Sequence, residues 1–243
     1  MRKLLASLLL LCVCLPQTHA QEADSSAFRP SQLIAPGVLV ASSMGIHFFA
    51  HDSWDASVQQ WAQELRNGKD VPRFDDWLQY SPYALDLGLG LVGVSAKHDF
   101  FDRTMEAALA CAVGAGVSWT SKRLFHTLRP NGKNYRSFPS GHSTTVFLGA
   151  ELVRMEYGWG WGAGAYTVAL TVGSMRIYRN WHWFSDVLFG AGIGILSAHA
   201  GEWLLQPAKN VLGIKEEAKV NLTLATSYDP FSGTLGSSLT VLF

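Results

Sequence analysis

The chain has 243 residues, of which 48% are apolar and 12% aromatic, so it can bury one substantial core and one main domain is expected. Nineteen Lys and Arg residues are balanced by nineteen Asp and Glu residues. This balance argues against nucleic-acid binding, which needs a basic patch or stripe.

The amino end has the features of an export signal. Arg2 and Lys3 precede an apolar run over residues 4–15, and residues 18–20 supply small side chains at the cleavage positions. The run is shorter than the ~20 residues of a full membrane span. Residues 1–20 are therefore predicted to be a signal peptide, and an uncleaved membrane anchor is the alternative.

A polar linker over residues 21–31 precedes the domain, which is expected over residues 32–210. Six apolar segments have the spacing and length of helices rather than strands. They cover residues 33–50, 83–96, 107–121, 144–157, 159–175 and 187–205. Residues 52–78 mix charge with tryptophan, as an amphipathic helix and a connector would. The expected fold is all-α, with about six helices.

The tail over residues 211–243 has a different pattern. Apolar and polar residues alternate from Val220 to Ser227, and residues 229–233 contain Asp, Pro and Gly before a second apolar stretch. This pattern predicts a short C-terminal β-hairpin.

Two of the apolar segments, residues 33–50 and 157–175, are free of charge over nearly 20 residues and are candidate membrane spans. If all six segments crossed a membrane, an exported amino end would place the polar motifs described next in the cytoplasm. We expect instead a domain of the cell envelope that is membrane-associated and faces the periplasm. It is either integral to the inner membrane or translocated whole. The sequence does not indicate an oligomeric state.

Three basic residues can hold a phosphoryl group. Lys122, Arg129 and Arg176 carry permanent positive charges, and the two guanidinium groups match the oxygens of a tetrahedral oxyanion. Such charges bind the group and stabilise it as charge shifts in a transition state.

Residues 138–142 read as a loop entering a helix, because Pro139 and Gly141 interrupt regular structure. The free N–H groups of a helix start, with Ser140 as cap and ligand, form an anion site. His142 then stands in the first turn, where a protonated imidazole could donate to a leaving oxygen.

His182 and Asp186 are four residues apart and share one face if their segment is helical. Asp186 can fix the imidazole tautomer, which leaves the other ring nitrogen free to attack phosphorus. Each motif alone is common in ordinary helix starts. Their occurrence together between residues 122 and 186 indicates a catalytic site.

These motifs resemble those of the type 2 phosphatidic acid phosphatases, whose fold is shared with vanadium haloperoxidases. The family pattern is Lys-x6-Arg-Pro, Pro-Ser-Gly-His and Ser-Arg-x5-His-x3-Asp; here it reads KRLFHTLRP, PSGH and SMRIYRNWHWFSD. The resemblance implies a helical, metal-independent phosphohydrolase without a cofactor. It further implies that His182 is the nucleophile, through a phosphohistidine, that His142 is the acid and that Asp186 orients His182. The implied phosphate ligands are Lys122, Arg129, Ser140, Gly141 and Arg176.

One departure is Met175, which stands where the family usually has Ser, with Ser174 one place earlier. The wider stretch over residues 33–205, including FDDWLQYSPYA at 74–84, is similar to bacterial envelope phosphatases of this family, some of which act on lipid A. The expected substrate is therefore a membrane lipid phosphate: lipid A, phosphatidylglycerol phosphate, phosphatidate or undecaprenyl diphosphate.

Three alternative functions remain open: a vanadium-dependent haloperoxidase, a broad-specificity periplasmic acid phosphatase and a non-enzymatic scaffold. No metal site is expected, because acidic residues do not cluster with His142 and His182 at ligand spacing. Three further basic residues near the motifs, His126, Arg136 and Arg179, are interpreted as surface charges on loops. His47 and His199 are interpreted as satisfied histidines of the core or an interface.

Overall fold

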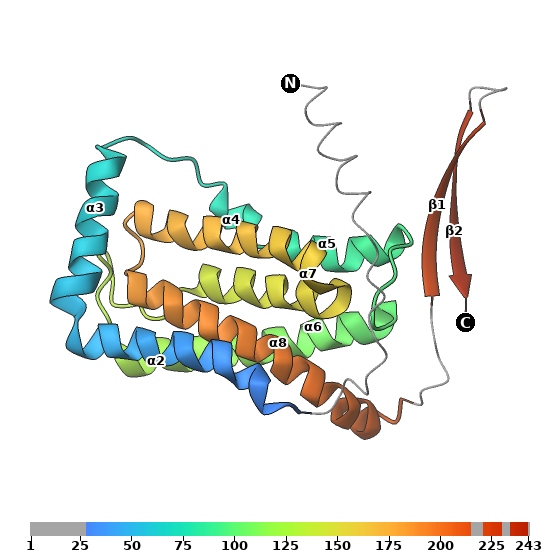
Figure 1. Ribbon diagram of the computed structural model, residues 1–243, viewed down its shortest axis with the longest axis horizontal. Coiled ribbons are helices and arrows are strands. Elements are labelled where there is room, and N and C mark those ends of the chain that lie inside the picture. Colours follow the sequence, from blue (N-terminus) through green and yellow to red (C-terminus); the bar gives the residue numbers. More distant parts are fainter. Residues whose placement is uncertain (1–27, 215–220, 230–233, 243) are drawn as a thin grey trace.

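The computed structural model describes residues 28–214, 221–229 and 234–242, and the main body is a bundle of helices, as predicted (Figure 1). The predicted signal peptide and most of the linker over residues 21–31 lie outside the described residues. The helices are η1 Pro30–Leu33, α2 Ile34–Phe49, η2 His51–Asp55, α3 Ala56–Arg66, α4 Asp75–Leu78, α5 Ser81–Leu91, α6 Phe100–Phe125, α7 Gly141–Tyr178 and α8 Phe184–Leu212.

The predicted helix boundaries differ from the observed ones where a local signal sets the end. α5 stops at Leu91 rather than at residue 96, and Gly93 just beyond it has a φ of 87°, which favours glycine. α6 begins earlier than predicted, because the Asp99 side chain caps it by accepting from the Asp102 N–H at 2.8 Å. The extension places charged residues on the first turns of α6.

The long element α7 reverses direction at Gly158, which has a φ of 75° and a ψ of −175°. Its two halves, residues 141–157 and 159–178, lie side by side in Figure 1 and run in opposite directions. A Cβ on Gly162 would lie 2.8 Å from Cβ of Arg154, so the halves approach closely just after the turn. The reversal falls between the predicted segments 144–157 and 159–175, and it returns Arg176 to the end of the bundle where α7 begins.

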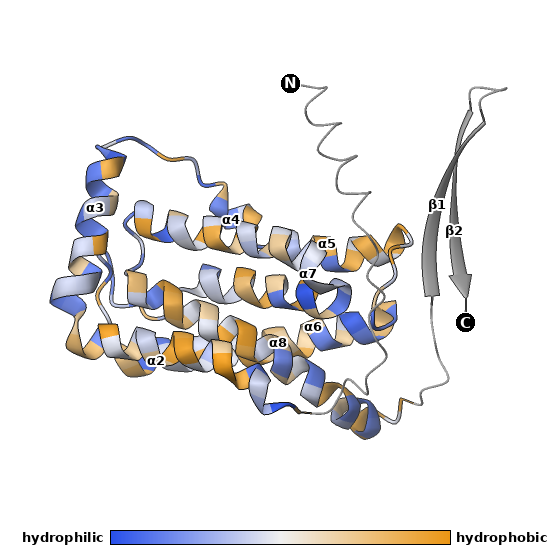
Figure 2. Cartoon of the chain, viewed as in Figure 1, coloured by the Kyte–Doolittle hydropathy of each residue, from blue (hydrophilic) through white to orange (hydrophobic). Residues whose placement is uncertain are grey.

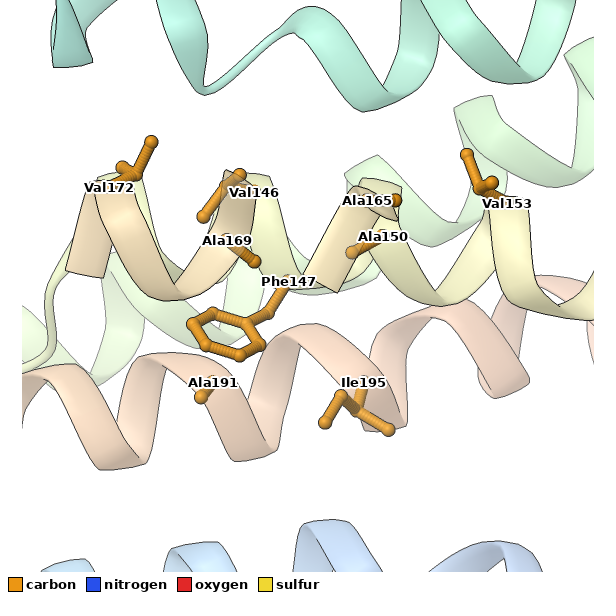
Figure 3. Close-up of a cluster of buried hydrophobic side chains, with 9 residues drawn as sticks. All are labelled: Val146, Phe147, Ala150, Val153, Ala165, Ala169, Val172, Ala191 and Ile195. Atoms are coloured by element: carbon orange, nitrogen blue, oxygen red, sulfur yellow. The ribbon is translucent and has the colours of Figure 1, made fainter. Parts of the chain in front are cut away.

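The largest buried apolar cluster joins the two halves of α7 to α8 (Figure 3). The Phe147 ring points from the first half of α7 toward Ala191 of α8. Most other members are small or β-branched, which lets three helical segments meet at short distance. The cluster consists of Val146, Phe147, Ala150, Val153, Ala165, Ala169, Val172, Ala191 and Ile195.

α8 lies between α7, α6 and α2, and its glycines allow the close approach. A Cβ on Gly194 would lie 2.6 Å from the Thr144 carbonyl oxygen on α7. A Cβ on Gly201 would lie 2.8 Å from Cβ of Ala110 on α6. Backbone of α8 therefore rests directly on its neighbours, which fixes the position of its amino end.

Among the described helices, two are long and apolar enough to cross a membrane: Pro30–Phe49 and Phe184–Leu212. α8 is mostly buried and serves as the core helix, whereas the apolar side chains of α2 are largely exposed; both helices appear mainly white and orange in Figure 2. The predicted candidate span at residues 33–50 is thus confirmed as a candidate. The segment at residues 157–175 is not one of the two.

The C-terminal hairpin is present as predicted. β1 Asn221–Asp229 pairs antiparallel with β2 Thr234–Leu242, with Asn221 opposite Leu242 and Asp229 opposite Thr234. The turn between the strands lies outside the described residues.

The contact of α8 with α7 predicts an unequal effect of two glycine substitutions. Gly194→Ala should lower the free energy of unfolding by about 1–3 kcal/mol, because its methyl group forces α8 away from Thr144. Gly164→Ala, where a Cβ meets nothing within 4 Å, should be neutral or stabilising by up to about 1 kcal/mol. Denaturant unfolding in detergent measures both, and equal effects would contradict the packing argument.

Candidate active site

The predicted site residues gather at one end of the bundle. Lys122 lies in the last turn of α6, His142 in the first turn of α7, Arg176 in the last turn of α7 and His182 just before α8. The reversal of α7 at Gly158 brings its last turn, which carries Arg176, back beside its first turn, which carries His142. Residues separated by 60 positions in the sequence therefore belong to one site.

Lys122 ties the end of α6 to the loop that precedes α7. Its ammonium group donates to the Pro139 carbonyl and, at 3.2 Å, to the Arg136 carbonyl. These neutral acceptors hold the side chain without cancelling its charge. The cation therefore remains available to an anion.

Ser140 caps α7, as predicted. Its hydroxyl oxygen accepts from the Ser143 N–H at 3.4 Å and from the Ser143 hydroxyl at 2.9 Å. The Ser140 N–H donates to the Asp186 carbonyl at 3.0 Å, which joins the start of α7 to the start of α8. Because Ser140 is fully buried, its side chain organises the helix start.

His142 pairs with Asp76 of α4, a residue that the sequence analysis did not single out. His142 Nε2 lies 2.9 Å from Asp76 Oδ1, and Arg176 donates to the same oxygen at 3.3 Å. Burial and the charge of Arg176 lower the pKa of His142, while Asp76 acts to raise it. Burial would raise the pKa of Asp76, but its hydrogen bond to His142 and the nearby charges lower it.

Asp75 forms ion pairs with two arginines. Its buried carboxylate accepts from Arg176 at 2.6 Å and from Arg179 at 2.5 Å. The interpretation of Arg179 as a surface charge was wrong, because its side chain is only 8% exposed and pairs with Asp75. The signal in the sequence was the Asp-Asp pair at 75 and 76, which opens a short helix.

His182 and Asp186 form the second histidine–carboxylate pair. His182 Nδ1 lies 3.4 Å from Asp186 Oδ2, and that oxygen also accepts from the Ser137 hydroxyl at 2.5 Å and from the Trp183 N–H at 2.8 Å. Burial lowers the pKa of His182 to about 4, outweighing Asp186, and the charges of Lys122 and Arg176 act in the same direction as burial. His182 is therefore neutral at ordinary pH. Ser137 was missed, because its role comes from a contact 49 residues away.

Arg129 and Arg176 both lie near the Trp181 ring, with Cζ at 4.8 and 5.7 Å from the ring centroid. Burial lowers the pKa of Arg129, and Arg176 lowers it further. The buried Nε–H groups of both arginines have no hydrogen-bond partner within residues 28–214. Two neighbouring cations with unused donors form a site for an anion.

A cavity of about 590 Å³ opens beside this site, between α5, α6 and α7. Three predicted residues, Lys122, Gly141 and His142, line it. The rest of its wall is mainly apolar or aromatic, and Arg129, Arg176 and His182 are not among its lining residues. Those other lining residues are Gln79, Tyr80, Tyr83, Cys111, Gly114, Ala115, Ser118, Trp119, Thr144, Thr145 and Leu148.

Asp75, Asp76 and His142 present ligand atoms within 4.8 Å of one another, a grouping that the spacing of the sequence did not reveal. Arg176 pairs with both carboxylates, and Arg179 pairs with Asp75. The negative charge of both carboxylates is thus already paired with arginine side chains.

The motif-bearing region is similar to known proteins. Residues 103–209 match the model of the PAP2 superfamily. Lipid A 1-phosphatase of Porphyromonas gingivalis is 36% identical over 137 residues, which cover 54% of this chain and 31% of that protein. The putative undecaprenyl-diphosphatase YbjG of Escherichia coli is 33% identical over 123 residues, which cover 45% of this chain and 61% of that protein.

Two solved structures are also similar. The crystal structure of Aquifex aeolicus LpxE matches with a TM-score of 0.46 and 21% identity, over 58% of this chain and 92% of that one. A transmembrane PAP2-type phosphatidylglycerolphosphate phosphatase from Bacillus subtilis matches with a TM-score of 0.37 and 20% identity, over 77% of this chain and 97% of that one.

The stretch that carries all three motifs matches the PAP2 superfamily, and the chain is similar to members of that superfamily. Within it, the chain resembles the bacterial lipid A phosphatases. It spans about a third of the length of the first curated relative and three fifths of the second.

The contact between Asp76 and His142 predicts the direction of a titration. In the parent protein the Asp76 carboxylate favours the charged imidazole of His142 and so raises its pKa. Asp76→Asn removes this charge and should lower the pKa of His142 further. The ¹⁵N chemical shifts of the ring nitrogens against pH measure this change. Asp70→Asn, which removes an exposed carboxylate outside the site, is the control. An unchanged His142 titration in Asp76→Asn would contradict the pairing.

Proposed function

We propose that this protein is a metal-independent phosphohydrolase that removes phosphate from a membrane lipid phosphate. The observation that carries the proposal is the pair of histidine–carboxylate contacts, His182 with Asp186 and His142 with Asp76, beside arginines that have unused donors. One pair suits a nucleophile and the other suits an acid.

The phosphoryl group is held by the cations and by the start of α7. Arg129, Arg176 and Lys122 supply charge, and the N–H groups at Gly141 and His142 supply the donors of a helix amino end. The unused Nε–H groups of both arginines gain acceptors when phosphate binds. Asp75 keeps Arg176 in place during the reaction.

The reaction then takes two steps. Nε2 of His182 attacks phosphorus, the bond from phosphorus to the leaving oxygen breaks, and that oxygen takes the proton of His142. Asp186 accepts a hydrogen bond from the Nδ1–H group of His182 and so stabilises the positively charged ring. Water next attacks the phosphohistidine and gives its proton to His142, which releases phosphate and restores both histidines.

The required protonation states are compatible with the environment of each ring. His182 must be neutral, and burial lowers its pKa to about 4. His142 must be charged, and Asp76 opposes the effect of burial on its pKa. Bound phosphate adds negative charge beside His142 and favours its charged form still more. The reactive pair is therefore populated at mildly acidic pH.

The protein is membrane-associated, and the cavity beside His142 offers a place for a lipid chain. Its mainly apolar wall runs from Lys122 and His142 along α6 to Cys111, eleven residues or about 16 Å from Lys122. A phosphate bound at the polar end would leave an attached acyl or prenyl chain in this channel. The two relatives are a lipid A 1-phosphatase and a putative undecaprenyl-diphosphatase, and their names support this class of substrate.

The active face is assigned to the periplasm because of the export signal expected at residues 1–20. This assignment requires either that fewer than six segments span the membrane or that the bundle is translocated whole, since a full set of crossings would place the site in the cytoplasm. The exposed apolar side of α2, including Ile34, Val38 and Phe48, then rests in the membrane.

The test is phosphate release by purified protein in the presence of chelator, from lipid A, phosphatidylglycerol phosphate, phosphatidate, undecaprenyl diphosphate and a soluble aryl phosphate. We expect turnover of a lipid substrate and a loss of at least about 10⁴-fold in His182→Ala. His142→Ala should lose about 10²–10⁴-fold with a poor leaving group and far less with a good one.

Release from the aryl phosphate alone would replace the lipid proposal with a broad-specificity acid phosphatase. Folded protein that releases phosphate from no substrate would overturn the proposal. Vanadate-dependent oxidation of halide would then identify the haloperoxidase alternative.

Filling the cavity should separate lipid from soluble substrates. Ala115→Phe places a ring in the channel and should raise KM for the lipid about tenfold or more, since roughly 1–3 kcal/mol of apolar contact is lost. Turnover of the aryl phosphate should stay within about twofold. Ala112→Phe adds the same ring at an exposed position of α6 outside the cavity wall and is the control. Equal losses for both substrates would show that the channel does not hold the lipid chain.

A further inference from the structure

A second group of polar side chains lies at the other end of α6. It combines His98, from the segment before α6, with Glu106 in the second turn of α6 and Glu156 at the end of the first half of α7. Sixteen residues separate Glu106 from Lys122, so about 24 Å of helix lies between this group and the phosphate site. The proposed phosphatase reaction uses none of these three residues.

The three side chains converge on one point. His98 Nδ1 lies 2.6 Å from Glu156 Oε1 and 3.6 Å from Glu106 Oε2, and one ligand atom from each residue lies within 4.8 Å of the others. Ligands about 2.0–2.2 Å from a single zinc ion are at most about 4.4 Å apart. Small side-chain shifts would therefore bring all three into one coordination shell.

Glu106 is the independent sign that a ligand belongs here. Its side chain is 1% exposed, and neither carboxylate oxygen has a hydrogen-bond partner within residues 28–214. A buried carboxylate in this state must either keep a proton or pair with a cation.

The nearby cations do not neutralise the group. Lys97 pairs with Glu202 at 2.5 Å. Arg103 forms no ion pair with Glu106 or Glu156; it donates to the Asp86 carbonyl at 2.7 Å and to the Tyr157 hydroxyl, and its charge is balanced by the nearby Asp86 carboxylate. A protonated His98 supplies one positive charge against the two carboxylates of Glu106 and Glu156. One of the two negative charges is then left unbalanced. A divalent ion bound to neutral His98 would balance both carboxylates.

We propose that His98, Glu106 and Glu156 bind a divalent transition-metal ion of the zinc class. One imidazole and two carboxylates are a donor set for such an ion, and water completes the shell. The His98 side chain is 19% exposed, which gives the ion a route from solvent. The ion would join the segment before α6, the first turns of α6 and the end of the first half of α7.

The test uses the full chain in detergent, stripped with chelator, and Zn²⁺ alone as the probe. Equilibrium dialysis with metal analysis should show that the parent protein binds one more Zn²⁺ per chain than His98→Ala or Glu106→Gln. Because loss of an outer-shell partner already costs about 10–100-fold, loss of a ligand should weaken this site by at least about 100-fold. Zinc bound by other histidines is common to all variants and cancels in the difference.

Glu64→Gln, which removes an exposed carboxylate on α3, is the matched control and should bind Zn²⁺ like the parent protein. Zn²⁺ should raise the Tm of the parent and of this control but not of the two site variants. Equal zinc binding by the parent, His98→Ala and Glu106→Gln would overturn the proposal and leave Glu106 as a buried carboxylic acid. The measurement does not depend on phosphatase activity.

Discussion

The reversal of α7 at Gly158 is the constraint on which the active site depends. A single helix through this point would carry Arg176 more than 50 Å from His142, at about 1.5 Å a residue. The turn instead lets Asp75 and Asp76 bridge the two ends, since one carboxylate holds Arg176 and the other holds both Arg176 and His142. Small residues in the returning half and glycines in α8 allow the helices to pack this closely.

The arrangement of charge explains why this end of the bundle suits a phosphate. Arg176 and Arg179 have carboxylate partners, so their charges are largely balanced. Lys122 binds only backbone carbonyls, and Arg129 forms no ion pair within residues 28–214. Two uncompensated positive charges beside a helix amino end match the two negative charges of a phosphate monoester. The carboxylates therefore set the net charge of the site as well as its geometry.

The sequence predicted elements whose signals are local. Hydrophobic periodicity located the helices, and the Pro-Ser-Gly-His motif located the capped start of α7, because breakers and caps act within one turn. Asp76, Ser137 and Arg179 could not be found in this way, since each acts through a partner 49 to 104 residues away. The same limit applies to His98 and Glu156, which are 58 residues apart and meet only after α7 has packed against α6.

The two polar groups share α6 and α7 but need not share a function. Glu156 lies two residues before Gly158, so an ion bound there would hold the first half of α7 at its turn. The turn has a second brace, because Glu151 accepts from Arg154 at 2.6 Å and, across the two halves, from Tyr166 at 2.6 Å. The return of Arg176 to His142 is thus supported without the ion. A cation at His98, Glu106 and Glu156 would accordingly affect the stability of the bundle more than the geometry of the phosphate site.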